Sequence, residues 1–520
     1  MKSTLRGFLS QNGPLIMVLA GLSVLLAAPV LAQAPVPGDG PFNLTLFHTN
    51  DSHSAFLPRE ATWRDDRKLI GGAVPLAWHL ARERETVSAD LFLDAGDFMT
   101  GNPVCEFAED GVKGVAVARM MNLLGYDAGV IGNHEFDNGR ENVVRLLEHF
   151  DFPLLAADLQ GPDGEAISPR GPLILERGGL KVGIMGVSCA GMDEVVAPAK
   201  LDGLSLASQA ELVRAQAADL DDRTDLLVLI THNGVGGDKE LAQELEGSGV
   251  DVIVGGHSHS RLKRPLMEGG ILIVQAGSKW TNLGRLDLQV EDDRIVRYDG
   301  RLVDLWAEGA VADPELMDLV SGYETRLQAE FGTQIGTLAT EWRKGRGEHN
   351  LGNFLADQIR LFDDADVAFI NGGGIRAGLA AGPITAMDIH RILPFSNSVV
   401  KMEMSGDLLA DVIQQNANAE VSGAHGILQV SGVTYAFRAA PDGKTALVTE
   451  VLVDGRSLDR AAVYEAAMPD YVAMMAKVYL NIEVPDYEDS GVTLAECVIK
   501  AIKRSGPIDS RIEGRIQRLD

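Results

Sequence analysis

The sequence predicts an α/β protein, because short apolar runs alternate with longer amphipathic segments through most of its 520 residues. The short runs have the length of buried strands, and the longer segments repeat their apolar residues at helical spacing. Such alternation is typical of layered domains in which helices cover the faces of a sheet. With 46% hydrophobic and 23% charged residues, the composition is that of globular domains, and the length allows two of them.

Residues 1–34 have the pattern of an export signal. Lys2 and Arg6 precede an apolar run, and small residues follow at Ala32 and Ala34. A basic region, an apolar region and a small-residue cleavage site together define a secretory signal peptide. The alternative is an uncleaved anchor, because the apolar run approaches the length that spans a bilayer. We expect cleavage of the signal and a periplasmic or secreted protein.

The charge balance excludes one broad class of function. The chain has 74 acidic and 46 basic residues, for a formal net charge of −28. Extended nucleic-acid surfaces rely on Lys and Arg, so binding of a long nucleic acid is not expected. Cys105, Cys189 and Cys497 are too few and too scattered for a disulfide framework, although one disulfide remains open.

Seven apolar runs of strand length occupy the first part of the chain. They cover residues 44–47, 91–93, 128–131, 154–156, 182–187, 226–230 and 252–254. Five polar or glycine-rich corners follow such runs: H-T-N-D-S-H, D-A-G-D, I-G-N-H-E, I-T-H-N and V-G-G-H-S-H. The carboxyl ends of strands are where α/β folds place their chemistry. We therefore expect the chemistry in this first part.

The five corners carry side chains that bind metal ions. The corners contain Asp51-Ser52-His53, Asp94 and Asp97 on either side of Gly96, Asn133-His134-Glu135-Phe136-Asp137, His232-Asn233, and His257-Ser258-His259. Any one corner also fits a structural histidine or a polar loop, but five in succession favour a metal centre. Mixed oxygen and nitrogen ligands suit Zn, Mn, Fe or Co better than Ca or Mg. In hydrolytic sites two such ions lie about 3.5–4 Å apart.

A linker helix is predicted between the first part and a second α/β part. Over residues 313–330 the apolar residues recur at helical spacing after the start signal Asp313-Pro314. We place the linker at residues 306–335. The second part runs from 336 to 520, with a helix expected to begin at Asn350.

The motifs taken together resemble a known superfamily. The order D-x-H, G-D, G-N-H-E-F-D, H and G-H-x-H resembles the calcineurin-like metallophosphoesterases. The later N-G-G-G-I-R at 371–376 resembles the bacterial 5′-nucleotidase and UDP-sugar hydrolase family in particular. The resemblance covers roughly residues 42–440. It implies a four-layer αββα metallophosphoesterase domain at 42–305 and a smaller α/β 5′-nucleotidase C-terminal domain at 336–520, which binds the substrate.

The resemblance also implies roles for individual residues. It assigns Asp51, His53, Asp97 and His259 to one divalent metal ion, and Asp97, Asn133, His232 and His257 to the other. His134, with Asp137 as its partner, matches the catalytic dyad of the family, although His134 could also serve only to pack its loop. The expected step is attack of metal-activated water on phosphorus. Asp94 and Glu135 are expected to accept hydrogen bonds from the imidazole N–H groups of the ligands.

Substrate contacts are expected in the second part. The glycines after Asn371 allow backbone amides to approach an anion, and Arg376 offers a bidentate fork. The resemblance assigns both residues to substrate binding. A further basic residue is expected before Asn350, and three residues compete for that role: Arg343, Lys344 and Arg346.

The sequence departs from the family where members clamp the nucleotide base between two aromatic rings. Ile427 occupies the position before Leu428-Gln429-Val430, and the G-G-D-G-aromatic motif is absent from the sequence. One ring could instead come from Tyr471, Tyr479 or Tyr487, each of which is also an ordinary packing residue.

These observations favour hydrolysis of nucleoside 5′-monophosphates, with UDP-sugars as further substrates. The alternative within the enzymes is a 2′,3′-cyclic-nucleotide 2′-phosphodiesterase and 3′-nucleotidase. Remoter alternatives are a thiosulfate-ester hydrolase and an inactive metal-containing binding protein. A Rossmann oxidoreductase is excluded, because no G-x-G-x-x-G follows the first strand. A nucleotide-type phosphate ester is the expected partner, and no stable membrane partner is expected.

Overall fold

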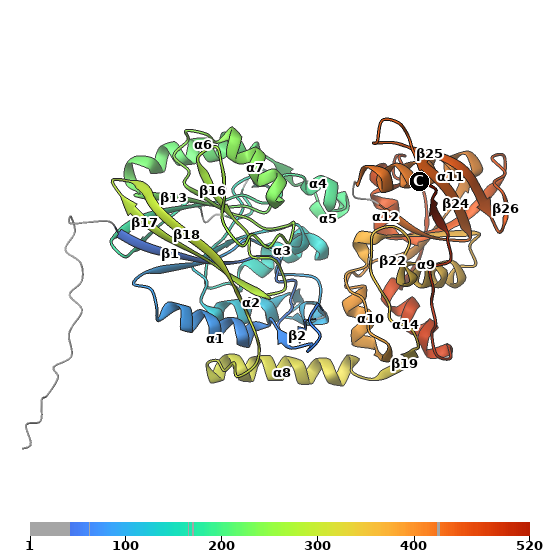
Figure 1. The fold of residues 1–520 in the computed structure, drawn as a ribbon, viewed down its shortest axis with the longest axis horizontal. Helices are drawn as coiled ribbons and strands as arrows, with labels where there is room; N and C mark the ends of the chain where they lie inside the picture. Colours follow the sequence, from blue (N-terminus) through green and yellow to red (C-terminus); the bar gives the residue numbers. More distant parts are fainter. Residues whose placement is uncertain (1–41, 62, 165, 169–170, 424–426) are drawn as a thin grey trace, which may run out of the picture. The chain divides into compact units, whose positions relative to one another are not determined.

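The computed structural model describes residues 42–520 except 62, 165, 169–170 and 424–426. The predicted signal peptide at 1–34 lies outside these residues. Within them, none of the helices is both long enough and apolar enough to cross a membrane. The fold is α/β throughout, as the sequence predicts, with strands and helices alternating along the chain (Figure 1).

Two six-stranded sheets form the framework of the first part, in the orders β18-β17-β1-β4-β7-β8 and β10-β11-β13-β14-β16-β15. The first sheet contains β1 (Phe42–Thr49), β4 (Asp90–Asp94), β7 (Ala128–Val130), β8 (Leu154–Leu155), β17 (Asn282–Glu291) and β18 (Arg294–Asp304). The second contains β10 (Leu173–Arg177), β11 (Leu180–Gly186), β13 (Leu226–Ile230), β14 (Val252–Val254), β15 (Leu266–Glu268) and β16 (Ile271–Val274). The central strands of each sheet are parallel, so their carboxyl ends lie at one edge.

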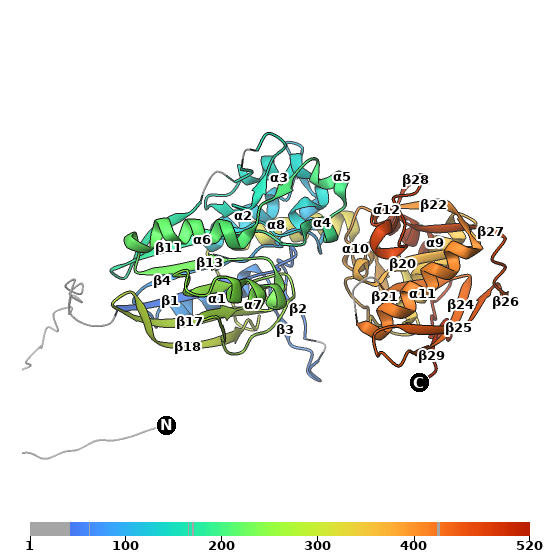
Figure 2. The same ribbon diagram turned by 90° about the horizontal axis from the view of Figure 1, so that it is seen from above.

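Helices cover the outer faces of both sheets, which gives four layers. The helices are α1 (Ala73–Arg84), α2 (Val115–Leu124), α3 (Arg140–Leu147), α4 (Met192–Val195), α5 (Pro198–Leu201), α6 (Gln209–Leu220), α7 (Gly234–Glu244) and α8 (Pro314–Phe331). Helices α6 and α7 pack on the second sheet, α1 and α2 pack on the first, and α8 packs on α1 and α2 (Figures 1 and 2). A separate apolar core fills the space between the sheets.

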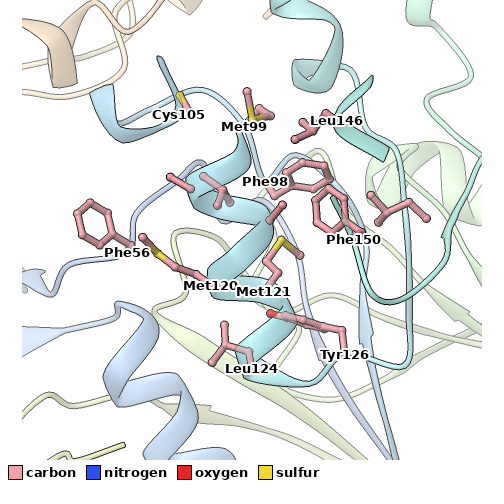
Figure 3. Packing of buried hydrophobic residues seen from close by; sticks show 14 of the residues in the cluster. Phe56, Phe98, Met99, Cys105, Met120, Met121, Leu124, Tyr126, Leu146 and Phe150 are labelled. Carbon is pink, nitrogen blue, oxygen red and sulfur yellow. The ribbon is translucent and has the colours of Figure 1, made fainter. Parts of the chain in front are cut away.

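The alternation of side chains along each strand produces these cores. In β1, Leu44 and Leu46 face the opposite sheet, whereas Phe47 faces the helices. Full burial of such a side chain contributes about 1.5–3 kcal/mol. Figure 3 shows the helical core, where Met121 and Leu124 of α2 lie near Tyr126. The apolar runs of the sequence are therefore strands buried on both faces.

The predicted linker helix is α8, and Asp313 caps it by accepting a hydrogen bond from the backbone N–H of Glu315. Its buried residues belong to the same apolar core as α1 and α2: Leu316, Val320, Tyr323 and Leu327. The helix expected from Asn350 is α9 (Asn350–Phe362). The domain boundaries at 42–305, 306–335 and 336–520 stay predictions.

The second part contains a five-stranded sheet and a four-stranded sheet, in the orders β23-β20-β27-β22-β28 and β26-β25-β24-β29. The strands are β20 (Val367–Asn371), β22 (Ser398–Ser405), β23 (Leu428–Ser431), β24 (Val433–Ala439), β25 (Ala446–Val453), β26 (Arg456–Ser457), β27 (Val463–Pro469), β28 (Glu488–Thr493) and β29 (Ile516–Arg518). Two apolar cores flank the five-stranded sheet. Residues of α9, α10 (Ala386–Ile392) and α14 (Leu494–Arg504) lie in one, and those of α11 (Gly406–Ser422) and α12 (Asp470–Met474) in the other.

The remaining elements are short. They are β2 (Arg59–Glu60), β3 (Leu69–Ile70), β5 (Ala108–Glu109), β6 (Val112–Lys113), β9 (Leu159–Gln160), β12 (Ser205–Leu206), β19 (Gln334–Leu338), β21 (Gly382–Thr385), α13 (Ala476–Tyr479) and the 3₁₀ turns η1 (Pro103–Glu106), η2 (His134–Asn138), η3 (Asp221–Arg223) and η4 (Gly372–Gly374). Cys105, Cys189 and Cys497 are all buried and free, so the disulfide left open by the sequence is not formed.

Candidate active site

Five loops at the carboxyl ends of strands bring the predicted metal ligands together. The loops follow β1, β4, β7, β13 and β14, which belong to the parallel regions of the two packed sheets. They carry Asp51 and His53, Asp97, Asn133, His232, and His257 with His259. Ligand atoms of six of these residues, together with His134, form three overlapping groups, and within each group the atoms lie within 4.8 Å of one another.

Asp51 presents one free oxygen to the site. Its Oδ2 accepts hydrogen bonds from Asn50 Nδ2 at 2.5 Å and from the backbone N–H of His257 at 2.9 Å. Its Oδ1 is buried without a hydrogen-bond partner among the described residues, and lies 3.2 Å from His259 Nε2. The carboxylate is therefore held by one oxygen while the other is available to a cation.

His53 and His259 face each other through their Nε2 atoms, which are 2.9 Å apart. The Nδ1 of His53 lies 3.2 Å from the carbonyl oxygen of Met99, which can only accept, so the proton resides on Nδ1. The lone pair of His53 Nε2 then points into the site. Together with Asp51, the two imidazoles form one of the three groups.

Asp97, like His53, belongs to two of the three groups. It belongs to one group with His53 and His134 and to another with His232 and His257. Its Oδ1 accepts the backbone N–H of His134 at 2.9 Å, and its Oδ2 lies 3.1 Å from His232 Nε2. Burial raises the pKa of the carboxyl, but His232 and His134 outweigh that effect and hold the pKa of Asp97 well below its usual range.

His232, His257 and Asn133 lie on the other side of Asp97. The Nδ1 of His232 donates to the carbonyl oxygen of Ala95 at 2.5 Å, and its buried Nε2 has no hydrogen-bond partner in the described structure. His257 Nδ1 and Asn133 Oδ1 are 2.9 Å apart. Thus the structure brings the seven predicted metal residues, Asp97 among them, together in one cluster.

The donor set and its geometry fit divalent cations. The free Asp51 Oδ1 and His232 Nε2 are 4.0 Å apart, and polar atoms buried without a partner are costly unless a ligand satisfies them. Five of the seven residues also have left-handed backbone torsions: Asp51, His53, Asp97, His257 and His259. Such strain clusters at functional sites, where the surrounding structure fixes it.

His134 and Asp137 form the predicted pair. His134 Nδ1 lies 2.8 Å from Asp137 Oδ2, and Thr100 Oγ1 donates to the same oxygen at 2.5 Å. Burial lowers the pKa of His134, but Asp137 and Asp97 outweigh burial, and the net pKa is raised. The Nε2 of His134 lies 3.9 Å from Asp97 Oδ2, so the imidazole faces the metal residues.

The prediction that Asp94 accepts from a ligand imidazole is wrong. Asp94 instead accepts hydrogen bonds from Thr49 Oγ1 at 2.6 Å and from the backbone N–H of Gly96 at 3.1 Å. The imidazole N–H groups of His53 and His232 go to backbone carbonyl oxygens, which lie nearer to them. Burial raises the pKa of Asp94 to about 7.

The same prediction is wrong for Glu135, which accepts only backbone N–H groups. Its carboxylate receives them from Asp97 at 3.1 Å, Met99 at 3.0 Å and Gly132 at 2.7 Å. Tight loops leave buried amides that need acceptors, and Glu135 supplies them. Its function is therefore to join the Asp97 loop to the Asn133 loop.

The predicted substrate residues follow β20. Asn371 is buried, and its Nδ2 donates to Tyr479 Oη at 3.4 Å. The guanidinium of Arg376 donates from Nη2 to His53 Nε2 at 3.3 Å. Arg376 therefore lies at the metal residues, whereas Asn371 is held by a tyrosine of its own part of the chain.

Of the three candidate basic residues, Lys344 is the one whose pKa is affected by Arg376. Burial and Arg376 lower the pKa of Lys344 to about 8. Arg343 instead pairs with Glu341 at the surface. Arg346 lies beside Gly423 and Glu420.

Ile427 and Tyr479 contact the glycine-rich loop. Gly372 donates its backbone N–H to the carbonyl oxygen of Ile427 at 2.9 Å. The rings of Tyr471 and Tyr479 have centroids 6.0 Å apart, and Tyr487 packs against the apolar core beside α11. No second ring stacks face to face with Tyr479 among the described residues.

Sequence reasoning missed three residues near the site. Asn50 holds Asp51, and its place directly before the D-S-H motif was an available signal. Lys279 donates its backbone N–H to the carbonyl oxygen of Asp51 at 2.7 Å. The ring of Phe395 lies 5.5 Å from that of His134. No local pattern marks Lys279 or Phe395.

Comparison with known proteins identifies both parts of the chain. The model of the calcineurin-like phosphoesterase family matches residues 44–261, and that of the 5′-nucleotidase C-terminal domain matches residues 329–481. A 5′-nucleotidase of Vibrio cholerae is 26% identical over 561 residues, which cover 96% of this chain and 98% of that protein. The trifunctional nucleotide phosphoesterase YfkN of Bacillus subtilis is 26% identical, and the chain spans only 35% of its length.

A solved structure has the same two-part architecture. The crystal structure of a 5′-nucleotidase precursor from Thermus thermophilus superposes with a TM-score of 0.80, at 26% identity, over 92% of this chain and 100% of that one. Both family models and the relatives follow the order of parts that the structure shows. The chain therefore belongs to the calcineurin-like phosphoesterases that carry a 5′-nucleotidase C-terminal domain, a family of metal-dependent phosphoric-ester hydrolases.

Proposed function

We propose that this chain hydrolyses nucleoside 5′-monophosphates at a centre of two divalent metal ions, Zn, Mn or a similar metal. The observation that carries the proposal is the convergence of seven donor residues, Asp97 among them, with Asp51 Oδ1 and His232 Nε2 buried and unsatisfied. The 5′-nucleotidases among the relatives support the choice of substrate.

In this proposal the seven residues divide into two sets that share Asp97. Asp51, His53 and His259 hold one ion, and Asn133, His232 and His257 hold the other. When bound, such a pair of ions acidifies a water molecule and neutralises charge that develops on a phosphoryl group. Asn50, Glu135 and the carbonyl oxygens of Ala95 and Met99 keep the donors in place.

His134 contributes a charge of its own. Asp137 fixes the Nδ1–H of the imidazole, so Nε2 faces the space beside Asp97. A protonated imidazole at this position stabilises negative charge on the phosphoryl group or on the leaving oxygen. Thr100 orients Asp137 and thereby the imidazole.

The substrate contacts form the second element of the proposal. Arg376 lies within 3.3 Å of His53 Nε2, close enough to bind a phosphate held at the metal residues. We assign the phosphate to Arg376 and Lys344, and the nucleoside to the loop of Asn371. We also propose that UDP-sugars are further substrates and that the chain is exported to the periplasm or secreted, as its residues 1–34 predict.

Phosphate release from a panel of esters tests the proposal. The protein is stripped of metal, reconstituted with Mn or Zn, and offered 5′-AMP, 3′-AMP, UDP-glucose and 2′,3′-cyclic AMP, the last two coupled to a phosphatase, and a thiosulfate-ester mimic whose release of sulfate is measured. We expect metal-dependent release from 5′-AMP. Preferential turnover of 2′,3′-cyclic AMP and 3′-AMP would instead identify the phosphodiesterase alternative, and turnover of the thiosulfate ester alone would identify that hydrolase. Two bound ions without turnover of any ester would indicate a binding protein.

A further inference from the structure

The loop after β14 carries two imidazoles that belong to different clusters. His257 groups with Asp97 and His232, whereas His259 groups with Asp51 and His53. The two residues are separated by Ser258 alone. One short loop must therefore aim two side chains at two positions simultaneously.

The backbone of this loop is strained at both histidines. His257 has a φ of 73° and His259 a φ of 54°, in the left-handed region that residues with a β-carbon rarely adopt. Such a conformation is costly and persists only where the surrounding structure fixes it. A β-carbon on Gly256 would overlap the carbonyl oxygen of Ala95 and the ring of His232, so the loop also lies close to the other site residues. Something must hold the loop in this conformation.

Gln275, directly after β16, makes three hydrogen bonds to the loop. Its Nε2 donates to the carbonyl oxygen of Gly256 at 2.6 Å. Its Oε1 accepts from Ser258 Oγ at 2.9 Å and from the backbone N–H of Ser260 at 2.5 Å. The side chain of Gln275 is fully buried, at 0% exposure, and contacts no metal residue through these bonds.

The three bonds alternate with the two histidines along the chain. Gln275 holds positions 256, 258 and 260, while the side chains at 257 and 259 reach the site. His257 Nδ1 meets Asn133 Oδ1, and His259 Nε2 meets His53 Nε2. Ser258 Oγ also accepts the backbone N–H of Val235, which ties the same point to the start of α7.

We propose that Gln275 is a positioning residue of the metal centre, whose single carboxamide fixes the loop at 256–260 so that His257 and His259 serve two different ions. The inference rests on the proposed metal binding, not on the identity of the substrate. Both amide atoms are required, because one donates and the other accepts. Partners that orient metal ligands typically change metal affinity by about 10–100-fold when they are removed.

The test is Mn²⁺ binding to the full chain with Gln275→Met, which keeps the length of the side chain and removes all three bonds. We expect the Kd of at least one ion to rise by about 10–100-fold. We also expect the electron paramagnetic resonance signal of a spin-coupled Mn pair to be lost. Gln275→Glu keeps the two accepted bonds and should recover part of the affinity, which also provides a second variant if Gln275→Met does not fold.

Gln429→Met is the matched control. Gln429 is equally buried, donates from Nε2 to the carbonyl oxygen of Gly347 at 2.8 Å and accepts the backbone N–H of His349 at 3.1 Å, far along the chain from the loop. It should lower the melting temperature without changing Mn²⁺ affinity. Wild-type affinity and a coupled signal in Gln275→Met would overturn the proposal, as would an equal loss of affinity in Gln429→Met.

The readouts separate this inference from the proposed function. A wild-type chain that binds two Mn²⁺ ions but releases no phosphate from nucleotides contradicts the nucleotidase function, while the comparison of Gln275→Met with wild type still decides the inference. A wild-type chain that binds fewer than two Mn²⁺ ions overturns the inference directly.

Discussion

The loops after β1, β4, β7, β13 and β14, which carry the candidate metal ligands and which we call the metal edge, are built differently from the glycine-rich loop after β20. At the metal edge, backbone carbonyls and buried side chains such as Asn50, Glu135 and Gln275 hold the candidate ligands. In the loop after β20, Asn371 has one long side-chain hydrogen bond, and Arg376 has none to its own part of the chain among the described residues.

The fold itself fixes the candidate metal ligands, whereas Asn371 and Arg376 are left with few partners until a substrate binds. Donors for metal ions must be placed within a few tenths of an ångström, which needs rigid support around them. Groups that bind a substrate can gain their partners on binding. Substitutions at the metal edge should therefore abolish chemistry, whereas those in the loop should weaken substrate binding.

The largest effect is expected for Asp97→Asn. Asp97 belongs to two of the three groups of metal residues, so the loss of its charge should reduce the bound metal at both positions. Phosphate release from 5′-AMP should fall by about 10²–10³-fold or more. Metal content per chain, measured by elemental analysis, checks the cause. Asp158→Asn, which removes a buried carboxylate bonded to Ser188 and Gln209, is the control and should retain both ions. Two ions in Asp97→Asn would refute the shared role.

His134→Ala should come next in size. Both ions should remain, because the proposed ligands are intact, while kcat falls by about 10²–10⁴-fold. Steady-state kinetics on the metal-loaded variant measure this change. His79→Ala, on α1 with its ring bonded to the carbonyl oxygen of Trp306, should retain kcat. Near-normal turnover in His134→Ala would show that this imidazole takes no part in the chemical step. It would also contradict the expectation that substitutions at the metal edge affect the chemistry whereas those in the loop affect substrate binding.

Arg376→Ala tests the role of the glycine-rich loop in substrate binding. Loss of one charge-assisted contact to phosphate should raise KM for 5′-AMP by about 10–100-fold, with a smaller effect on kcat. Arg460→Ala, which removes a surface arginine paired with Asp407, should leave KM unchanged. A large fall in kcat with unchanged KM would mean that Arg376 acts in the chemical step instead.

The smallest effect concerns a buried carboxyl beside the metal edge that no proposed step uses. Burial raises the pKa of Asp238 to about 7, while Thr231 Oγ1 donates to its Oδ1 at 2.6 Å and its Oδ2 has no hydrogen-bond partner in the described structure. From about pH 4 to pH 7 the unfolded chain releases a proton that the folded chain keeps, so this group destabilises the fold increasingly as pH rises.

Asp238→Asn removes that titration. The free energy of unfolding of the metal-free variant should exceed that of wild type by at least about 1 kcal/mol at pH 8, the equivalent of one pKa unit, and the difference should shrink toward pH 4. Denaturant unfolding at the two pH values measures it. A difference that does not depend on pH would show that Asp238 is ionised in the folded state.

The sequence predicts the metal edge well because its signals are local. Each ligand closely follows an apolar strand, and parallel strands bring their carboxyl ends to one edge of a sheet, so Asp51 could be grouped with Asp97, and His232 with His257, without a structure. The supporting contacts depend on distances across the fold. The acceptor role of Glu135 and the place of Gln275 could not be predicted, because nothing local specifies which amides they meet.

The second part was less predictable for a related reason. Arg376 follows a recognisable glycine-rich motif, yet its position beside His53 depends on residues distant in sequence. Phe395 near His134 has no local signal at all. The binding of the base depends on loops around Ile427 and Tyr479, whose packing only the tertiary structure shows.

Anomalous diffraction from crystals of the Mn-reconstituted protein tests the central claim most directly. We predict two Mn peaks about 3.5–4 Å apart, the spacing of hydrolytic two-metal sites. Asp97 should contact both, with Asp51, His53 and His259 at one ion and Asn133, His232 and His257 at the other. A single peak, or two peaks that do not share Asp97, would contradict the account.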